Sequence, residues 1–189
     1  MVGRNILEHC EALKYEIFSP SSLELNLLDR DAVRYHFKAI RPDMVIHAAG
    51  RVGGIQANIA NPVDFLMQNL DMGLNVISTA ASVGVPNLLN FGSSCMYPRY
   101  AKNPLREDII LKGELEPTNE GYALAKIVSA KLCEYISVED ANKNKNYKTI
   151  IPCNLYGRYD KYDPRHSHLI PSVIRKLDEA KINGEKTVD

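Results

Sequence analysis

Three features of the 189-residue sequence predict an α/β fold built on a doubly wound parallel sheet. Helical patterns alternate with short apolar segments along the whole chain. The apolar segments are nearly continuous in hydrophobicity, as expected for parallel strands buried on both faces. Prolines and glycines stand at the boundaries between the segments, where they act as local breakers.

The first third of the chain is expected to open with a helix. Apolar residues recur at helical spacing over residues 4–14, at Ile6, Leu7, Cys10 and Leu13. A short strand, Tyr15–Phe18, follows, and a Ser/Pro turn comes after it. Asp29 or Asp31 can cap the next helix, over residues 32–40.

In the middle of the chain, the apolar run Met44–Ala49 predicts a buried strand, and a loop is expected after it over residues 50–54. A long helix is predicted over residues 62–83, because proline stands in its first turn and glycine follows its end. The next strand is Leu88–Phe91, and a loop rich in proline, glycine and charge covers residues 94–118.

In the last third of the chain, the sequence predicts a helix over residues 120–138, which the polar segment Asn142–Asn146 is expected to terminate. A strand at Lys148–Ile151 and a helix over residues 169–180 complete the pattern.

The ends of the chain depart from a complete fold of this class. A doubly wound dinucleotide-binding fold opens with a strand and a Gly-rich turn, whereas only Gly3 stands before the first helix here. We interpret residues 1–180 as a partial Rossmann-like domain without its first strand, and residues 181–189 as the start of a C-terminal region whose substrate domain is absent. The missing strand is expected between Tyr15–Phe18 and Leu88–Phe91. A compact domain that begins with a helix is the alternative.

Composition gives no sign of a nucleic-acid or membrane partner. Lys and Arg number 23, as do Asp and Glu, so the net charge is zero. The four cysteines are scattered, without metal-ligand spacing or the density of a disulfide framework. No apolar run is long enough to span a bilayer. We therefore expect a cytoplasmic protein without a metal site.

A tyrosine and a lysine four residues apart, Tyr122 and Lys126, share one face of a predicted helix. An ammonium beside a phenol favours the phenolate, so we expect the pKa of Tyr122 to lie below its usual value of about 10. Such a phenol can give a proton to a carbonyl group. Alone the pair is equally consistent with an ordinary surface helix.

Ser93 and Cys95 follow a predicted buried strand, at the carboxyl edge of the sheet where ligands bind in this class of fold. In extended backbone their side chains would point to the same side. The hydroxyl of Ser93 could orient a substrate carbonyl. The alternatives are a loop cap for Ser93 and a small buried hydrophobe for Cys95.

These motifs together resemble the extended short-chain dehydrogenase/reductases and, among them, the GDP-L-fucose synthase family. The resemblance covers nearly the whole chain and rests on Leu25–Asp29, Ala48-Ala49, Val52–Ile55, Gly92–Pro98, Leu115–Glu120, Tyr122–Lys126, Asn154–Gly157 and Ser167–Pro171.

The resemblance implies roles for particular residues. Ser93, Tyr122 and Lys126 match the catalytic triad, while Cys95 and His168 match the acid/base pair that epimerises the sugar. Lys176 lies where the family places a basic residue near the nucleotide-sugar. The dinucleotide is expected against Gly3, Asn26, Leu27, Ala48, Ala49, Phe91, Gly92, Ser93, Ser94, Lys126, Pro152, Cys153, Asn154, Leu155 and His168.

The implied reaction is the NADPH-dependent 3,5-epimerisation and 4-reduction of GDP-4-keto-6-deoxy-D-mannose to GDP-L-fucose, by an enzyme that is a homodimer when complete. The C4 ketone acidifies the protons at C3 and C5, and a thiol and an imidazole can exchange such protons near neutral pH. We expect the 189 residues alone to be inactive.

Three observations keep other interpretations open. The region expected to meet the 2′-phosphate of NADPH, Ser19–Ser22, offers hydroxyls but no Arg. Another nucleotide-sugar epimerase is an alternative, whereas a dehydratase would need an Asp-Glu pair where Ser94 and Cys95 stand. A non-catalytic dinucleotide-binding protein is the remaining alternative.

Overall fold

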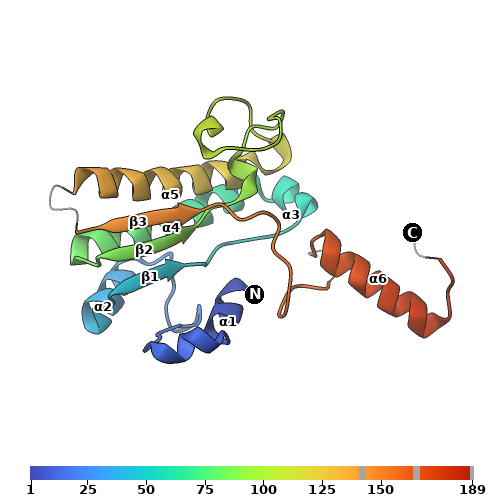
Figure 1. Ribbon diagram of the computed structural model, residues 1–189, viewed down its shortest axis with the longest axis horizontal. Helices are drawn as coiled ribbons and strands as arrows, with labels where there is room; N and C mark the ends of the chain where they lie inside the picture. Colours follow the sequence, from blue (N-terminus) through green and yellow to red (C-terminus); the bar gives the residue numbers. More distant parts are fainter. Residues whose placement is uncertain (141–143, 164–166, 188–189) are drawn as a thin grey trace.

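The computed structural model describes residues 1–140, 144–163 and 167–187. Its centre is a parallel sheet of three strands in the order β1-β2-β3 (Figure 1). The strands are β1 (Met44–His47), β2 (Asn87–Phe91) and β3 (Asn146–Ile150). The α/β fold class and the Rossmann-like parallel sheet are therefore confirmed.

Three helices and one face of the sheet enclose the main core. They are α2 (Arg30–Ile40), α4 (Pro62–Val83) and α5 (Glu120–Glu139), and α4 contacts both of the others. The buried side chains of the core include Val33, Phe37, Val76, Ile77, Ala80, Leu88, Cys133 and Tyr147. Burial alternates along β2 and β3, as it does when a helical layer covers one face of a sheet.

The second face of the sheet differs from the prediction that both faces are covered. Met44, Ile46 and Ile150 on this face are between 42% and 51% exposed. The terminal helices α1 (Val2–Leu7) and α6 (Leu169–Asn183) lie apart from it (Figure 1).

Local signals in the sequence set the ends of the long helices. The carboxylate of Asp29 accepts hydrogen bonds from the backbone N–H groups of Asp31 and Ala32, both at 3.0 Å, so Asp29 is the cap of α2. Helix α4 has proline in its first turn and ends at Gly84, whose φ of 85° suits glycine. Both boundaries of α4 agree with the prediction.

The region before α2 differs from the prediction of one helix and a strand. Helix α1 ends at Leu7, and a separate 3-10 turn, η1 (Cys10–Lys14), follows. Tyr15–Phe18 forms no strand: Tyr15 is 72% exposed and Phe18 is 52% exposed. None of the three strands in the described part of the chain pairs with this segment, so its side chains have no sheet beside them against which they could be buried.

The predicted strand order is also wrong in one respect. β1 pairs directly with β2, with Met44 opposite Asn87 and His47 opposite Asn90. The strand that precedes Ser93 is therefore central, and Met44–His47 is an edge strand of the sheet. The reason is that α4 connects the two strands in a single crossover, and strands joined in this way usually lie side by side.

Short helical turns went unpredicted, because six residues or fewer carry too little periodicity. They are α3 (Ile55–Ala60), η2 (Ser94–Met96), η3 (Glu107–Ile109) and η4 (Pro117–Asn119). The polar segment expected to close α5 includes residues 142 and 143, which lie outside the described residues. Helix α6 begins at Leu169 as predicted but ends at Asn183, three residues beyond the predicted end, and Gly184 caps it.

Candidate active site

At the end of β2, just before the site, the backbone of Gly92 lies in close contact with neighbouring atoms. The Gly92 N–H donates to Ile150 O over 2.8 Å. A Cβ atom on Gly92 would lie 2.9 Å from Met96 Sδ and 3.1 Å from Ile150 O, closer than side chains normally approach. Glycine at this position therefore lets β2 lie close to β3 just before Ser93.

Ser93 has the extended backbone expected for it, with φ −157° and ψ 149°, whereas Cys95 lies in the 3-10 turn η2 and departs from the expectation. Ser93 caps η2, and its Oγ accepts a hydrogen bond from the Cys95 N–H over 3.4 Å. The Ser93 hydroxyl also lies close enough to the Tyr122 phenol to influence its pKa. The turn therefore keeps hydroxyl, thiol and phenol together, although by a different geometry from the predicted one.

Lys126 joins helix α5 to the end of β2. Its side chain is buried, and Nζ donates to the carbonyl oxygen of Phe91 over 2.9 Å. The same Nζ lies 5.8 Å from the centre of the Tyr122 ring. The predicted helical pair is thus aimed at the carboxyl edge of the sheet, beside Ser93.

Burial dominates the electrostatics of this pair. It raises the pKa of Tyr122 to about 12, and the nearby Cys95 adds to the rise while the hydrogen bond with Ser93 opposes it. Burial likewise lowers the pKa of Lys126 to about 8. The expectation of a lowered pKa for Tyr122 is therefore wrong, because desolvation of the phenolate outweighs the ammonium 5.8 Å from the ring centre. At neutral pH the phenol keeps its proton and can donate it.

Cys95 has a partner that sequence reasoning missed. The side-chain amide of Asn119, the residue before α5, donates to Cys95 Sγ over 3.2 Å. The only signal in the sequence is that Asn precedes a predicted helix, which by itself indicates a cap. In the structure the Asn119 side chain makes no capping bond and instead holds the thiol.

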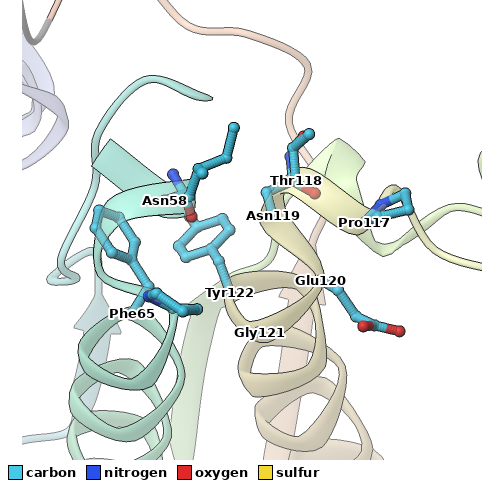
Figure 2. Close-up of a pocket in the computed structure, with 10 residues that line it drawn as sticks. Asn58, Phe65, Pro117, Thr118, Asn119, Glu120, Gly121 and Tyr122 are labelled. Carbon is cyan, nitrogen blue, oxygen red and sulfur yellow. The ribbon is translucent and has the colours of Figure 1, made fainter. Parts of the chain in front are cut away.

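A cavity of about 220 Å³ opens beside Tyr122, between α3, α4 and the start of α5 (Figure 2). Its polar wall includes Asn58 and Asn119, and its apolar wall includes Ile59 and Phe65. A cavity with both kinds of wall suits a ligand that has both hydroxyl and apolar surface.

The residues on α6 are not joined to this group by their described contacts. His168 caps α6 and is exposed, and its carbonyl accepts from the Ser172 N–H within the same helix. Its neighbour Ser167 approaches the loop before α3: a Cβ on Gly54 would lie 3.7 Å from Ser167 O. Lys176 is exposed about two turns further along α6. The pairing of His168 with Cys95 thus stays a prediction.

The other residues predicted to bind a dinucleotide fall into two groups. Ala48 and Ala49 follow β1, and Phe91, Gly92 and Ser94 follow along β2 and its turn, so they share the carboxyl edge with Lys126. Pro152–Leu155 follow β3 at the same edge. Asn26 and Leu27 form a turn further away, where Leu27 O accepts from the Asn75 side chain over 2.9 Å. Gly3 lies in α1, with open space around it.

The edge of the sheet fits the nicotinamide end of a dinucleotide. The Lys126 ammonium has three donors and gives one to Phe91 O, which leaves donors for ribose hydroxyls. Gly50 lies close by, since a Cβ there would be 3.7 Å from Lys126 Nζ. These residues come from three different elements, yet they meet around one buried cation.

The parallel sheet, with Ser93, Tyr122 and the buried Lys126 at its carboxyl edge, has the arrangement typical of the short-chain dehydrogenase/reductase class. Residues 1–188 match the model of the NAD dependent epimerase/dehydratase family. The chain belongs to this family.

Curated relatives narrow the resemblance. The chain is 54% identical over 189 residues to a GDP-L-colitose synthase from Yersinia pseudotuberculosis, covering all of this chain and 61% of the relative. It is 49% identical over 188 residues to a GDP-L-fucose synthase from Azorhizobium caulinodans, covering all of this chain and 59% of the relative. The predicted resemblance to GDP-L-fucose synthases is confirmed. The chain spans about 60% of the length of these relatives.

Solved structures agree. The chain superposes with a TM-score of 0.80 and 35% identity on a GDP-D-glycero-L-gluco-heptose synthase from Campylobacter jejuni in the presence of NADPH, covering 86% of this chain and 47% of that one. A GDP-L-fucose synthetase from Naegleria fowleri bound to NADP gives a TM-score of 0.79 at 29% identity, covering 88% and 50%. Among the described residues, no helix is both long and apolar enough to cross a membrane.

Proposed function

We propose that this chain is the dinucleotide-binding part of an NADPH-dependent enzyme that epimerises and reduces GDP-4-keto-6-deoxy-D-mannose to GDP-L-fucose. The observation that carries the proposal is the buried Lys126, which faces Tyr122 and bonds Phe91 O at the carboxyl edge of the sheet. Similarity to the GDP-L-fucose synthases supports the choice of substrate.

The reduction needs an acid for the oxygen at C4. Tyr122, with a pKa raised to about 12, keeps its proton until the oxygen becomes basic and then donates it. The Ser93 hydroxyl, which influences the pKa of this phenol, would orient it. A bound nicotinamide would supply the hydride for C4, and Lys126 would hold its ribose, with Phe91–Ser94 and Pro152–Leu155 around it, while Ala48 and Ala49 would line the adenosine end.

The epimerisation needs an acid and a base at C3 and C5, and the proposal gives these roles to Cys95 and His168. Removal of a proton next to the ketone leaves an enolate, whose oxygen the donors Ser93 and Tyr122 stabilise. Asn119 fixes the position of the sulfur. The role of His168 rests on the resemblance.

The remaining roles also rest on the resemblance. Gly3, Asn26 and Leu27 would face the adenosine and phosphate end of the dinucleotide, and Lys176 would face the nucleotide-sugar. Residues 1–180 would belong to the dinucleotide-binding domain, and residues 181–189 would begin a C-terminal region. We propose a cytoplasmic homodimer for the complete enzyme.

A second candidate differs only in the sugar. The 54% identity to a GDP-L-colitose synthase supports GDP-L-colitose as the alternative product. Both candidates use the same reductive group on β2 and α5.

The test is made on the protein with all residues that its gene encodes. Purified protein is mixed with NADPH and GDP-4-keto-6-deoxy-D-mannose, absorbance at 340 nm is followed, and the product is identified by NMR. We expect NADPH oxidation with formation of GDP-L-fucose. A reduced sugar that is not epimerised would contradict the roles of Cys95 and His168, and absence of oxidation would contradict the function.

A further inference from the structure

Asn58 is a buried amide whose orientation is fixed by two backbone carbonyls. Its side chain is 7% exposed and lies on α3. Nδ2 donates to Gly53 O over 3.0 Å and to Gly54 O over 3.1 Å. Because carbonyl oxygens only accept, the nitrogen must face them, and Oδ1 must face away.

The opposite end of this amide has no partner among the described residues. Asn58 Oδ1 is buried and makes no hydrogen bond, although buried polar atoms of proteins nearly always have one. Asn58 lines the cavity beside Tyr122 (Figure 2). An amide oxygen accepts hydrogen bonds and cannot donate them. Oδ1 itself has almost no exposed surface, so a donor in the cavity reaches it only when a neighbouring side chain shifts, and a donor is the one kind of group that can satisfy it.

We propose that Asn58 is a substrate-binding residue that accepts a hydrogen bond from a ring hydroxyl of the sugar. The inference rests on the proposed function, since it takes the 4-keto-6-deoxy sugar as the ligand. That sugar carries a ketone at C4, a methyl group on C5 and the nucleotide at C1. Its only ring hydroxyls are therefore those at C2 and C3.

The walls of the cavity agree with such a ligand. Tyr122, the proton donor to the C4 oxygen, lines the same cavity as Asn58, so ring atoms near C4 come within its reach. Ile59 and Phe65 offer apolar surface for the parts of the ring that lack hydroxyls. A sugar with a ketone in place of this hydroxyl would leave Oδ1 unpaired. Asn58 therefore also disfavours sugars that carry a carbonyl group at that position.

The test compares three substrates in the complete enzyme: GDP-4-keto-6-deoxymannose and its 2-deoxy and 3-deoxy analogues. kcat/KM is measured for the wild type, for Asn58→Ala and for the control Asn61→Ala. Asn61 is the same residue type just after α3, is exposed and does not line the cavity. Circular dichroism checks the fold of each variant.

We expect Asn58→Ala to lower kcat/KM for the parent sugar about tenfold or more, because the hydroxyl loses its acceptor. The analogue that lacks this hydroxyl should be used as poorly by the wild type and should not respond to the substitution. The responsive position, C2 or C3, identifies the hydroxyl. Asn61→Ala should change none of the three values more than about twofold.

Two outcomes would overturn the assignment. An equal loss for all three substrates in Asn58→Ala would show that Asn58 only supports the loop at Gly53 and Gly54. If Asn58→Ala does not fold, the wild type decides alone: equal use of all three substrates would exclude a hydroxyl contact. A wild type that reduces none of them would refute the proposed function itself, and the Asn58 assignment with it.

Discussion

The side-chain amide of Asn119 donates a hydrogen bond to Cys95 Sγ over 3.2 Å. This contact joins the start of α5 to the turn after β2. It holds the sulfur beside Tyr122, where proton transfer to and from the sugar is proposed.

We predict that Asn119→Ala slows epimerisation more than reduction. Loss of one such hydrogen bond corresponds to about a threefold to tenfold change in rate. Exchange of the C3 and C5 protons with solvent deuterium, followed by NMR without NADPH, measures the epimerisation step. The same exchange rate in Asn119→Ala and in wild type would show that the sulfur needs no positioning.

Removal of the phenol hydroxyl should separate chemistry from folding. Tyr122→Phe keeps the ring but has no proton to donate, so we expect kcat for NADPH oxidation to fall at least about 100-fold. Binding of the nucleotide-sugar, measured by calorimetry, should change little. A variant that turns over at the wild-type rate would exclude Tyr122 as the acid.

The substitution Cys95→Ser should affect epimerisation without affecting cofactor binding. We expect solvent exchange at C3 and C5 to fall at least about tenfold, because a hydroxyl is a much weaker base than a thiolate. NADPH affinity, measured by fluorescence titration, should stay within about twofold. Normal deuterium exchange would show that Cys95 only fills space.

The buried ammonium of Lys126 should make stability depend on alkaline pH. Its pKa is about 8 in the folded protein and about 10.5 when unfolded, so the unfolded chain binds the extra proton between these values. The contribution of Lys126 to stability therefore rises from pH 8 to pH 10, by up to about 3 kcal/mol. Urea unfolding should show this rise in the wild type and in Lys148→Met, an exposed control, but not in Lys126→Met.

His47 should have an analogous effect in acid. Burial and the nearby Lys126 lower its pKa from 6.5 to about 3. Between these values only the unfolded chain takes up a proton, so stability falls as the pH drops from 6.5 towards 3, by about 4 kcal/mol. Thermal unfolding of His47→Gln should depend less on pH in this range than that of His36→Gln. Equal slopes would show that His47 does not stay neutral.

The fold and the site differ in how far the sequence predicted them. The long helices α4 and α5 were found because many residues repeat the same period, and Pro62 in the first turn and Gly84 after the last residue mark the ends of α4. Tyr15–Phe18 has the composition of a strand, but strands form only when a neighbour supplies hydrogen bonds and a surface for burial, which no local pattern encodes.

In the site, too, features encoded by local spacing were predicted, and features that depend on contacts between distant segments were not. Tyr122 and Lys126 were found through their spacing on one helix. Asn58 and Asn119 were missed because an isolated asparagine in a loop or short helix is usually a cap or a turn residue. Their roles depend on contacts with Gly53 and Cys95 that appear only when separate segments meet. The reversed shift of the Tyr122 pKa was missed for a similar reason, because burial belongs to the folded chain.

The division of labour between the elements has a consequence for protein engineering. The groups for proton donation to the sugar lie on β2 and α5 and are fixed to each other by the Lys126 bond to Phe91 O. Asn58, which we propose binds a sugar hydroxyl, lies on the separate six-residue helix α3. A library confined to α3 and its flanking loop could therefore alter which keto sugars are accepted, while the reductive chemistry remains intact for selection to act on.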